Sequence, residues 1–342
     1  MSNCFNPANI LLPNDCIDME KWSVIACDQF TSQADYWDAV EKHVADAPST
    51  LNVVFPEIYL GTITKQENDC NSSGDGVKND KETGRKTKYA SMTDDERIKY
   101  INTTMETYLT DGTLKQAVAD GYVLVERTTE SGARLGIVGL IDLDDYDFDP
   151  KKKTLIRATE GTVISRIPPR VKIRENAAIE LPHVMLLVDD PIDRQKIDGC
   201  QGATQEDAVN IAAVKHGIIE YVYAIRDTLR KLYDTELMQG GGHIRGYAVE
   251  GEAAKQVTEA FAAKQNSCGG FLFAVGDGNH SLATAKTCWE NIKKTGKFTE
   301  EQLKNHPARH ALVEICNLHS EALEFKPIHR LLTLSLIHIS EP

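Results

Sequence analysis

The stretch FLFAVGDGNHSLATAK, residues 271–286, constrains the fold most, because its pattern changes from that of a strand to that of a helix. The apolar run up to Gly276 is typical of a strand buried on both faces. Beyond it, apolar residues recur at helical spacing on one face, which holds Leu282, Ala285, Trp289 and Ile292. Gly296 is placed to end this helix. We therefore expect the chain to cross from a buried strand into a helix at Asp277–Ser281.

Such a crossing suits an anion. Backbone N–H groups at a helix start have no intrahelical partner, and the helix dipole adds positive potential there. The glycines at 276 and 278 would let the backbone approach a phosphate or a carboxylate closely. The loop lacks the full phosphate-loop pattern GxxxxGK[ST], so spacing alone leaves a plain polar turn as the alternative.

Each side chain of the loop has a chemical and a structural interpretation. Asp277 could hold magnesium or act as a base, or it could close the turn by accepting loop N–H groups. His280 could donate to a phosphate or shuttle a proton, or it could be satisfied by a neighbouring carbonyl. Asn279 and Ser281 are competent helix caps.

A basic segment, KKKTLIRATEGTVISRIPPRVKIRE, covers residues 151–175 of a chain whose net charge is −13. Pro168 and Pro169 are expected to fix the backbone and to hold Ile167 extended. Rigidly presented guanidinium groups bind oxyanions in a bidentate way, so the segment could supply cations to the loop. The alternative is surface ion pairing, above all by the three lysines at 151–153, which follow the acidic run DLDDYDFDP. We interpret that run as a solvated turn, because it lacks the glycine and the glutamate of a calcium loop.

The composition narrows the class of protein. The acidic net charge and the pI near 5.3 make nucleic acid an unlikely partner and disfavour anionic membranes. The eight cysteines show no zinc or disulfide spacing, and no apolar run is long enough to span a membrane. A cytoplasmic location with reduced thiols fits these features best.

The rest of the chain predicts an α/β fold of the mixed α+β kind, with a mixed sheet and covering helices. Strands are expected over 22–26 and on both sides of a turn at 130–132, and helices over 93–109, 205–233 and 252–264. A polar insertion occupies 61–88. Residues 334–342 resemble a translated sequencing adapter, so we expect one domain over 1–333, incomplete at its C-terminus, and a non-native tail.

Four motifs in one order carry a family resemblance: WSVIACDQFTSQ, RATEGTVISRIPPRVKIRENAAIELPH, VGDGNHSLATAK and ALVEICNLHSEALEFKPIHRLL. Together they resemble the bacterial domain-of-unknown-function family numbered ten-fifteen, over about residues 8–333. That family is in turn similar to the ParB and sulfiredoxin-like superfamily, whose α/β core binds nucleotide phosphates at a helix start. The superfamily includes free-serine kinases with an Asp-Gly-His-His-Arg loop.

Carried over by position, Asp277, Gly278 and His280 match that loop, whereas Asn279 replaces its first histidine and Ser281 its arginine. The resemblance then implies that the missing charge comes from elsewhere. The candidates for holding the phosphate or nucleotide outside the loop are Arg157, Thr159, Thr162, Arg166, Arg170, His329 and Arg330.

The chemistry that the resemblance implies is phosphoryl transfer from ATP or ADP with magnesium to a small hydroxyl-bearing metabolite. The residues expected to act in catalysis are Glu160 near the attacking hydroxyl, Asp277 as metal ligand or base, and His280 as phosphate donor. An ion pair with Arg157 or Arg166 is the alternative for Glu160. A protein that binds a nucleotide or metabolite without turnover is the alternative function, and a DNA-associated protein is the weakest.

Overall fold

The computed structural model describes residues 3–26, 30, 33–59, 92–164, 167–181, 184–192, 211 and 216–323. Several predictions lie outside these residues. They are the insertion at 61–88, the first part of the expected helix over 205–233, the tail at 334–342, and the candidate site residues Arg166, His329 and Arg330.

Eleven strands in the described part of the chain form one mixed sheet, so the predicted α/β class is confirmed. The strands are β1 (Phe5–Asn6), β2 (Ala8–Pro13), β3 (Leu114–Thr129), β4 (Gly132–Asp142), β5 (Tyr146–Asp147), β6 (Ile156–Arg157), β7 (Val184–Val188), β8 (Arg230–Leu237), β9 (Gly242–Val249), β10 (Phe273–Asp277) and β11 (His310–Asn317).

Their order along the sheet is β5-β6-β10-β7-β11-β4-β3-β9-β8, with β1 beside β4 and β2 beside β3. The half from β11 to β8 is antiparallel. At the other end β10 runs parallel to β6 and antiparallel to β7. As a result, the segments that follow β6 and β10 leave the sheet at the same end of these two strands, although about 120 residues of sequence separate them.

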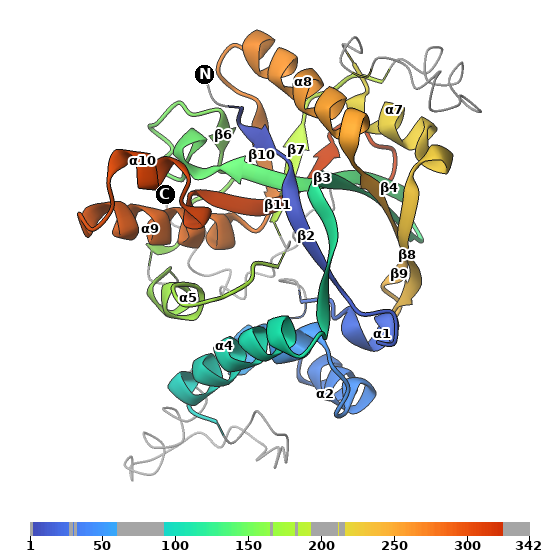
Figure 1. Ribbon diagram of the computed structural model, residues 1–342, viewed down its shortest axis with the longest axis vertical. Coiled ribbons are helices and arrows are strands. Elements are labelled where there is room, and N and C mark those ends of the chain that lie inside the picture. The colour runs from blue at the N-terminus through green and yellow to red at the C-terminus, as the bar shows by residue number, and fades with distance from the viewer. Residues whose placement is uncertain are drawn as a thin grey trace, which may run out of the picture.

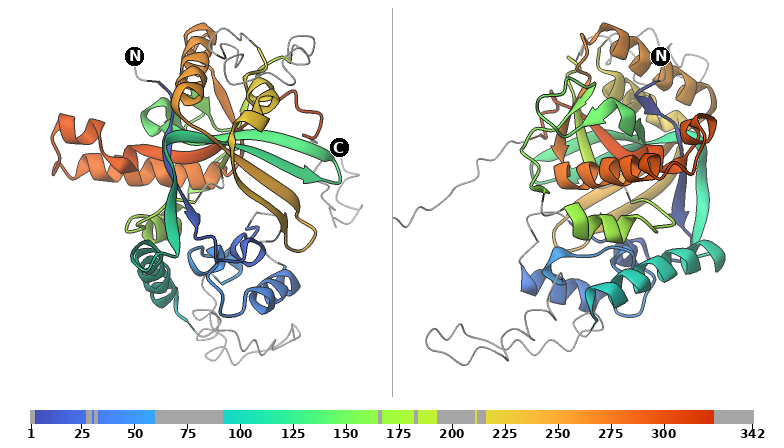
Figure 2. Two further views of the ribbon diagram at one scale, coloured as in Figure 1. Left: turned by 45° about the vertical axis from the view of Figure 1, so that its right-hand side comes forward. Right: turned by 90° about the vertical axis from the view of Figure 1, so that its left-hand side faces the viewer.

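The helices lie against the sheet in two groups (Figure 1, Figure 2). Those with defined bounds are α1 (Met19–Trp22), α2 (Ala34–Val44), α4 (Asp94–Thr110), α5 (Ile167–Arg174), α7 (Ile218–Ala224), α8 (Gly251–Ser267), α9 (Asn279–Lys294) and α10 (Glu300–Lys304). The largest core cluster joins α7, α8 and α9 to the sheet. Helices α1, α2 and α4 gather at the far end of β2 and β3 around two smaller clusters.

Single-turn 3-10 helices connect these elements. They are η2 (Thr50–Asn52), η3 (Glu57–Tyr59), η4 (Leu143–Asp145), η7 (Arg226–Thr228) and η8 (Pro307–Arg309).

The expected crossing at 277–281 is confirmed. Strand β10 lies between β6 and β7 with Phe273 and Val275 fully buried, and α9 begins two residues after the strand ends. Leu282, Ala285 and Trp289 are buried in the main core, as their helical spacing predicts. Gly296 has a φ of 63° directly after the helix, which is the left-handed conformation that commonly terminates helices. The turn at 130–132 and the helix over 93–109 are also confirmed as the β3–β4 hairpin and α4.

Three local predictions are wrong. Residues 22–26 form no strand: Trp22 ends α1, whose start Asp18 caps by accepting the N–H groups of Glu20 and Lys21, and residues 23–26 are irregular. The expected helix over 205–233 stops at Ala224, and Arg230–Leu237 pairs with β9 as β8. The apolar residues around 229–233 fit the period of a helix and that of a strand equally well. The Gly-rich turn before β9 brings β8 and β9 together and so favours the strand.

Ile167 is helical rather than extended. It opens α5, and Pro168 and Pro169 occupy the first turn of that helix, where a missing N–H costs no hydrogen bond.

Candidate functional site

The β10–α9 loop meets the segment that follows β6. Thr159 donates its hydroxyl to the carbonyl of Val275 at 2.6 Å, and its backbone N–H donates to Oδ1 of Asn279 at 3.2 Å. Asn279 returns a hydrogen bond from Nδ2 to Oγ1 of Thr159 at 3.3 Å, and its side chain is buried. Two of the predicted site residues are therefore joined across the parallel strand ends, which is the usual place for ligand crevices in such sheets.

The pairing of Asn279 with Thr159 corrects its predicted role as a helix cap. The cap position belongs to Gly278, and Asn279 is the first residue of α9. Its amide is used to hold the 158–164 segment, where Thr159 and its neighbours lie, rather than the helix N–H groups. Ser281, two residues further into the helix, does not stand at the cap position either.

His280 faces the same segment. Its Nε2 accepts the backbone N–H of Val163 at 3.2 Å, so the neutral ring carries its proton on Nδ1. That Nδ1 lies 3.8 Å from Oε1 of Glu160. The imidazole is mostly buried, with 14% of the side chain exposed, whereas 57% of Glu160 is exposed. A solvent-accessible carboxylate thus stands beside a held histidine, an arrangement suited to moving a proton.

The first turn of α9 lacks a side-chain cap. Gly278 has a φ of 85°, a conformation that residues with a Cβ rarely adopt, and as a glycine it offers no capping oxygen. Asp277 accepts the N–H of Gly278 at 2.7 Å through Oδ1, which closes the turn one residue before the helix. The N–H groups at the start of α9 are thus not covered by the cap residue, as an anion site requires.

Arg157 does not join this group. Its Nε and Nη2 donate to the carbonyls of Thr154 and Gly270, and its guanidinium lies 4.4 Å from the ring centre of Phe271. Those residues precede β10, a strand about 13 Å long whose other end carries the loop. These contacts hold the Arg157 guanidinium near the residues that precede β10, whereas the Asp277–Ser281 loop follows the other end of that strand.

The other predicted residues are placed in part. Arg170 lies on α5, and this helix packs along α9. Thr162 sits between Glu160 and Val163, and its Oγ1 is buried without a hydrogen-bond partner among the described residues. Arg166, His329 and Arg330 lie outside the described residues.

An ion pair that sequence reasoning missed joins β4 and β11, close enough to Asp277 for an electrostatic interaction. Arg134 on β4 donates through Nη2 to both carboxylate oxygens of Glu314 on β11, at 3.0 and 3.2 Å. Burial alone would lower the pKa of Arg134, but Glu314 and Asp277 are among the neighbours that raise it overall. The pair needs the glycine at 136, because a Cβ there would stand 2.3 Å from Oε1 of Glu314. Only the pairing of β4 with β11 reveals this cluster.

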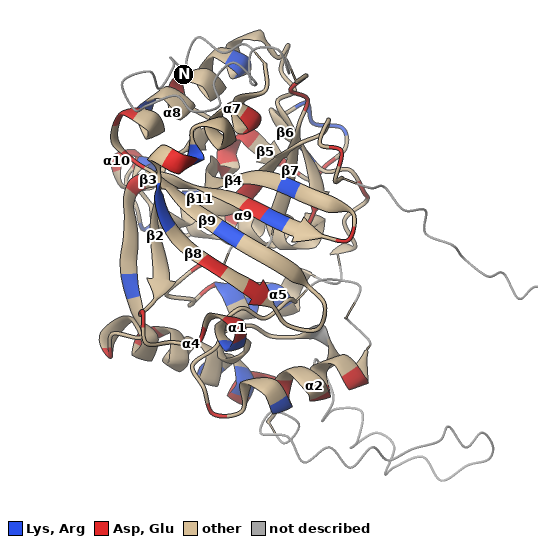
Figure 3. Ribbon diagram, turned by 90° about the vertical axis from the view of Figure 1, so that its right-hand side faces the viewer, with Lys and Arg blue, Asp and Glu red and all other residues tan. Residues whose placement is uncertain are grey.

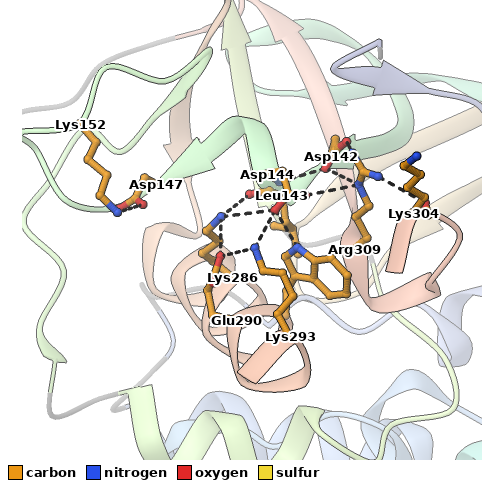
Figure 4. A network of polar contacts seen from close by, with 11 residues as sticks. Asp142, Leu143, Asp144, Asp147, Lys152, Lys286, Glu290, Lys293, Lys304 and Arg309 are labelled. Carbon is orange, nitrogen blue, oxygen red and sulfur yellow. Dashed lines mark hydrogen bonds and ion pairs between the residues drawn. The ribbon is translucent and has the colours of Figure 1, made fainter. Parts of the chain in front are cut away.

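The acidic run at 142–149 is largely neutralised by cations. Arg309 donates to both oxygens of the buried Asp142, at 2.6 and 3.0 Å, and Lys293 lies 3.0 Å from Asp144 (Figure 4). Lys152 pairs with Asp147 at 2.6 Å, as expected for the lysines at 151–153. The run is thus an anchor for α9 rather than a freely solvated turn.

The Asp277–Ser281 loop offers one carboxylate, that of Asp277, as a ligand for magnesium. Among the described residues no group of three or more His, Cys, Asp or Glu side chains could hold a metal ion. Asp277 alone fits a magnesium ion that takes most of its ligands from nucleotide phosphates and water, which is a common arrangement for this ion.

Residues of both charge signs lie on the neighbouring strands β8 and β9 (Figure 3). Lys231 and Arg245 both pair with Asp234, and Arg245 also pairs with Glu126. None of the described helices is long and apolar enough to cross a lipid bilayer.

Fold and site together define a mixed α/β protein in which an uncapped strand-to-helix loop follows the carboxyl end of an interior strand, β10. Its sequence matches the family described as "Protein of unknown function (DUF1015)" over residues 79–231 and 215–341. The chain belongs to this family. No curated protein and no solved structure shows a significant match to it.

Proposed function

We propose that this protein is a nucleotide-dependent phosphotransferase whose acceptor is a small hydroxyl-bearing metabolite, with its site at the Asp277–Ser281 loop. The observation that carries the proposal is the uncapped start of α9 directly beside the Glu160–His280 pair. The first is a place for phosphate oxygens, and the second is a place for the proton of an attacking hydroxyl. The resemblance to the free-serine kinases supplies the reaction class.

In this proposal Glu160 is the base. Its exposed carboxylate takes the proton of the acceptor hydroxyl, while the oxygen forms a bond to phosphorus and the bond to the leaving nucleotide phosphate breaks. The Nδ1 of His280 lies 3.8 Å from the carboxylate of Glu160, so a small movement of the exposed glutamate would let it accept the Nδ1 proton. The loop N–H groups hold the oxygens of the transferred group.

Asp277 has a separate role in this proposal. Magnesium held by Asp277 and the nucleotide phosphates would neutralise the charge on the transferred group. The charges of Arg134 and Asp277 attract each other across the sheet, and this attraction contributes to raising the pKa of Arg134. The cations that resemblance assigns to the phosphates are Arg170, Arg166 and Arg330, since Arg157 is engaged elsewhere.

The test is a direct search for product. Purified protein is incubated with serine, ATP or ADP, and magnesium, and phosphoserine is measured by mass spectrometry. We expect product from the parent chain, a loss of at least about a hundredfold in Glu160→Gln, and no change in Glu300→Gln, an exposed glutamate on α10. Equal rates in Glu160→Gln and the parent chain would refute the assignment of the base.

A second candidate is nucleotide or metabolite binding without turnover. Two observations favour it: Ser281 stands where the related kinases carry arginine, and Arg157 is turned away from the loop. Tight nucleotide binding in calorimetry without any phosphorylated product, from serine or from other small alcohols, would select this function.

A further inference from the structure

A cavity of about 280 Å³ lies at the end of the sheet where β7 and β11 finish, away from the β10–α9 loop. The β3–β4 turn forms one wall, and the segment after β11 forms another. Its lining residues are Ser131, Gly132, Ala133, Leu135, Ile192, Glu220, Ser320, Glu321 and Ala322. No residue of the Asp277–Ser281 loop is among them, so this cavity has no part in the phosphotransfer proposal.

Glu220 is the unusual member of this lining. Its Oε1 accepts Nδ2 of Asn317 at 2.9 Å, but its Oε2 is buried and has no hydrogen-bond partner among the described residues. Burial raises the pKa of Glu220, and the charge of Asp190 adds to this, whereas its own backbone N–H, the amide of Asn317 and the charge of His319 act in the opposite direction. A carboxylate oxygen left without a donor in such a place is costly.

The neighbouring donors are already engaged. Lys264 and the N–H of Ile218 both bind the carboxylate of Asp190, at 2.9 and 2.7 Å. The second hydrogen bond of Asn317 Nδ2 goes to the carbonyl of Asp190 at 2.7 Å. His319 lies 2.8 Å from Asp189 through Nε2. Among the described residues the nearby cations are thus paired with other acids, and none of them donates to Oε2 of Glu220.

We propose that this cavity binds a small primary ammonium ion with a short aliphatic chain, held by Glu220. An ammonium group brings a positive charge and three donors, which suit one carboxylate and the hydroxyls of Ser131 and Ser320. Leu135, Ile192 and the alanines at 133 and 322 offer apolar surface to the chain. The terminal torsion of glutamate is soft, so a small rotation brings Oε2 to the ligand. The volume is near the lower end of small-molecule sites, which fits a ligand of this size.

The charges fix the direction of the pH dependence. Glu220 binds an ammonium ion in its ionised form, so affinity rises as the pH rises through its elevated pKa. Asp190 faces Glu220 and opposes its ionisation, His319 favours it, and Lys264 is neutralised by Asp190.

Calorimetry with n-butylammonium and n-butanol, at a pH near the ordinary glutamate pKa of about 4.3 and at pH 8, tests the proposal on the full chain. We expect saturable binding of the ammonium ion, tighter at pH 8, and binding of the alcohol at least about tenfold weaker. Glu220→Gln keeps the shape of the side chain and its contact with Asn317 but removes the negative charge. It should weaken binding of the ammonium ion at least about tenfold. Ala322→Leu fills the cavity and should also abolish binding. Glu252→Gln, an exposed glutamate on α8, is the matched control and should bind as the parent chain does.

Equal affinity for the alcohol, undiminished binding by a folded Glu220→Gln chain, or no binding by the parent chain would overturn the proposal. These outcomes leave the phosphotransfer function unaffected, because that function is tested on different residues with a different readout. Circular dichroism of each variant separates loss of binding from loss of folding.

Discussion

A single residue, Gly136, makes room for the ion pair between Arg134 and Glu314 on the sheet. The carboxylate of Glu314 lies in the space that a side chain at 136 would fill, and from there it reaches Arg134. Both charged side chains are largely buried, with 24% of Arg134 and 19% of Glu314 exposed. A hydrogen atom at position 136 is thus the condition for an ion pair that also influences Asp277.

We therefore predict that Gly136→Ala destabilises the protein by about 2 kcal/mol, because the added Cβ forces Glu314 away and leaves a half-buried guanidinium without its carboxylate. Urea unfolding followed by circular dichroism measures this. Gly161→Ala is the control, since a Cβ there meets nothing within 4 Å. Equal stability of the two variants would contradict the account of the pair.

A pH effect belongs to Glu220. Its pKa is higher in the folded chain than in the unfolded one, so the ionised form disfavours folding. This penalty is present at neutral pH and disappears as the pH falls through the folded pKa toward the unfolded value of about 4.3. We predict that Glu220→Gln is more stable than the parent chain at pH 7 and that the difference shrinks on acidification. A difference that is independent of pH, measured by urea unfolding, would show that burial does not penalise this carboxylate.

At the scale of elements, α9 is fixed at its start and along its length. The first residues hold the 158–164 segment through Asn279 and His280. Nearly two turns further on, Lys286 is buried and donates to the carbonyl of Leu143 at 2.9 Å. Lys286 also pairs with Glu290 at 3.0 Å. The helix that presents the candidate anion site is thus tied to the end of β4 by polar contacts as well as by its apolar face.

Lys286→Met should therefore loosen α9. The variant leaves the carbonyl of Leu143 without its donor in a buried place, so we expect a loss of about 1–3 kcal/mol. Hydrogen exchange should show faster opening of α9 than in Lys294→Met, a variant of an exposed lysine on the same helix. Similar exchange in both variants would mean that the buried lysine does not anchor the helix.

The start of α9 also allows a gain-of-binding prediction. Ser281→Arg places a guanidinium in the first turn, so affinity for inorganic pyrophosphate should rise about tenfold if the loop binds phosphate as proposed. The gain should fall with salt concentration because it is electrostatic. Ser281→Gln, of similar length and without charge, should show no gain in calorimetry. If the two variants bind alike, the loop does not face the anion as proposed.

For the whole molecule, the sequence predicted what depends on local patterns and missed what depends on strand order. The crossing at 277–281, the β3–β4 hairpin and α4 each follow from period changes and caps. The expected helix over 205–233 failed because its apolar spacing also fits β8, and only the partner strand β9 decides between them.

The same distinction explains the site. Asp277 and His280 could be found in one motif, whereas the contact between Asn279 and Thr159 exists because β6 lies parallel to β10. Arg157 was a reasonable candidate by charge alone, and its direction was set by the carbonyls around the start of β10. Arg134 and Glu314 come together because β4 pairs with β11.

The central claim is that the start of α9 binds the phosphates of a nucleotide. Nuclear magnetic resonance of the ¹⁵N-labelled chain, titrated with ATP and magnesium, tests it most directly. We predict saturable shifts that are largest for the backbone amides of Gly278, Asn279 and His280, with smaller shifts along the 158–164 segment. Shifts that leave these amides unchanged at saturating nucleotide, or that centre on another part of the chain, would contradict the claim.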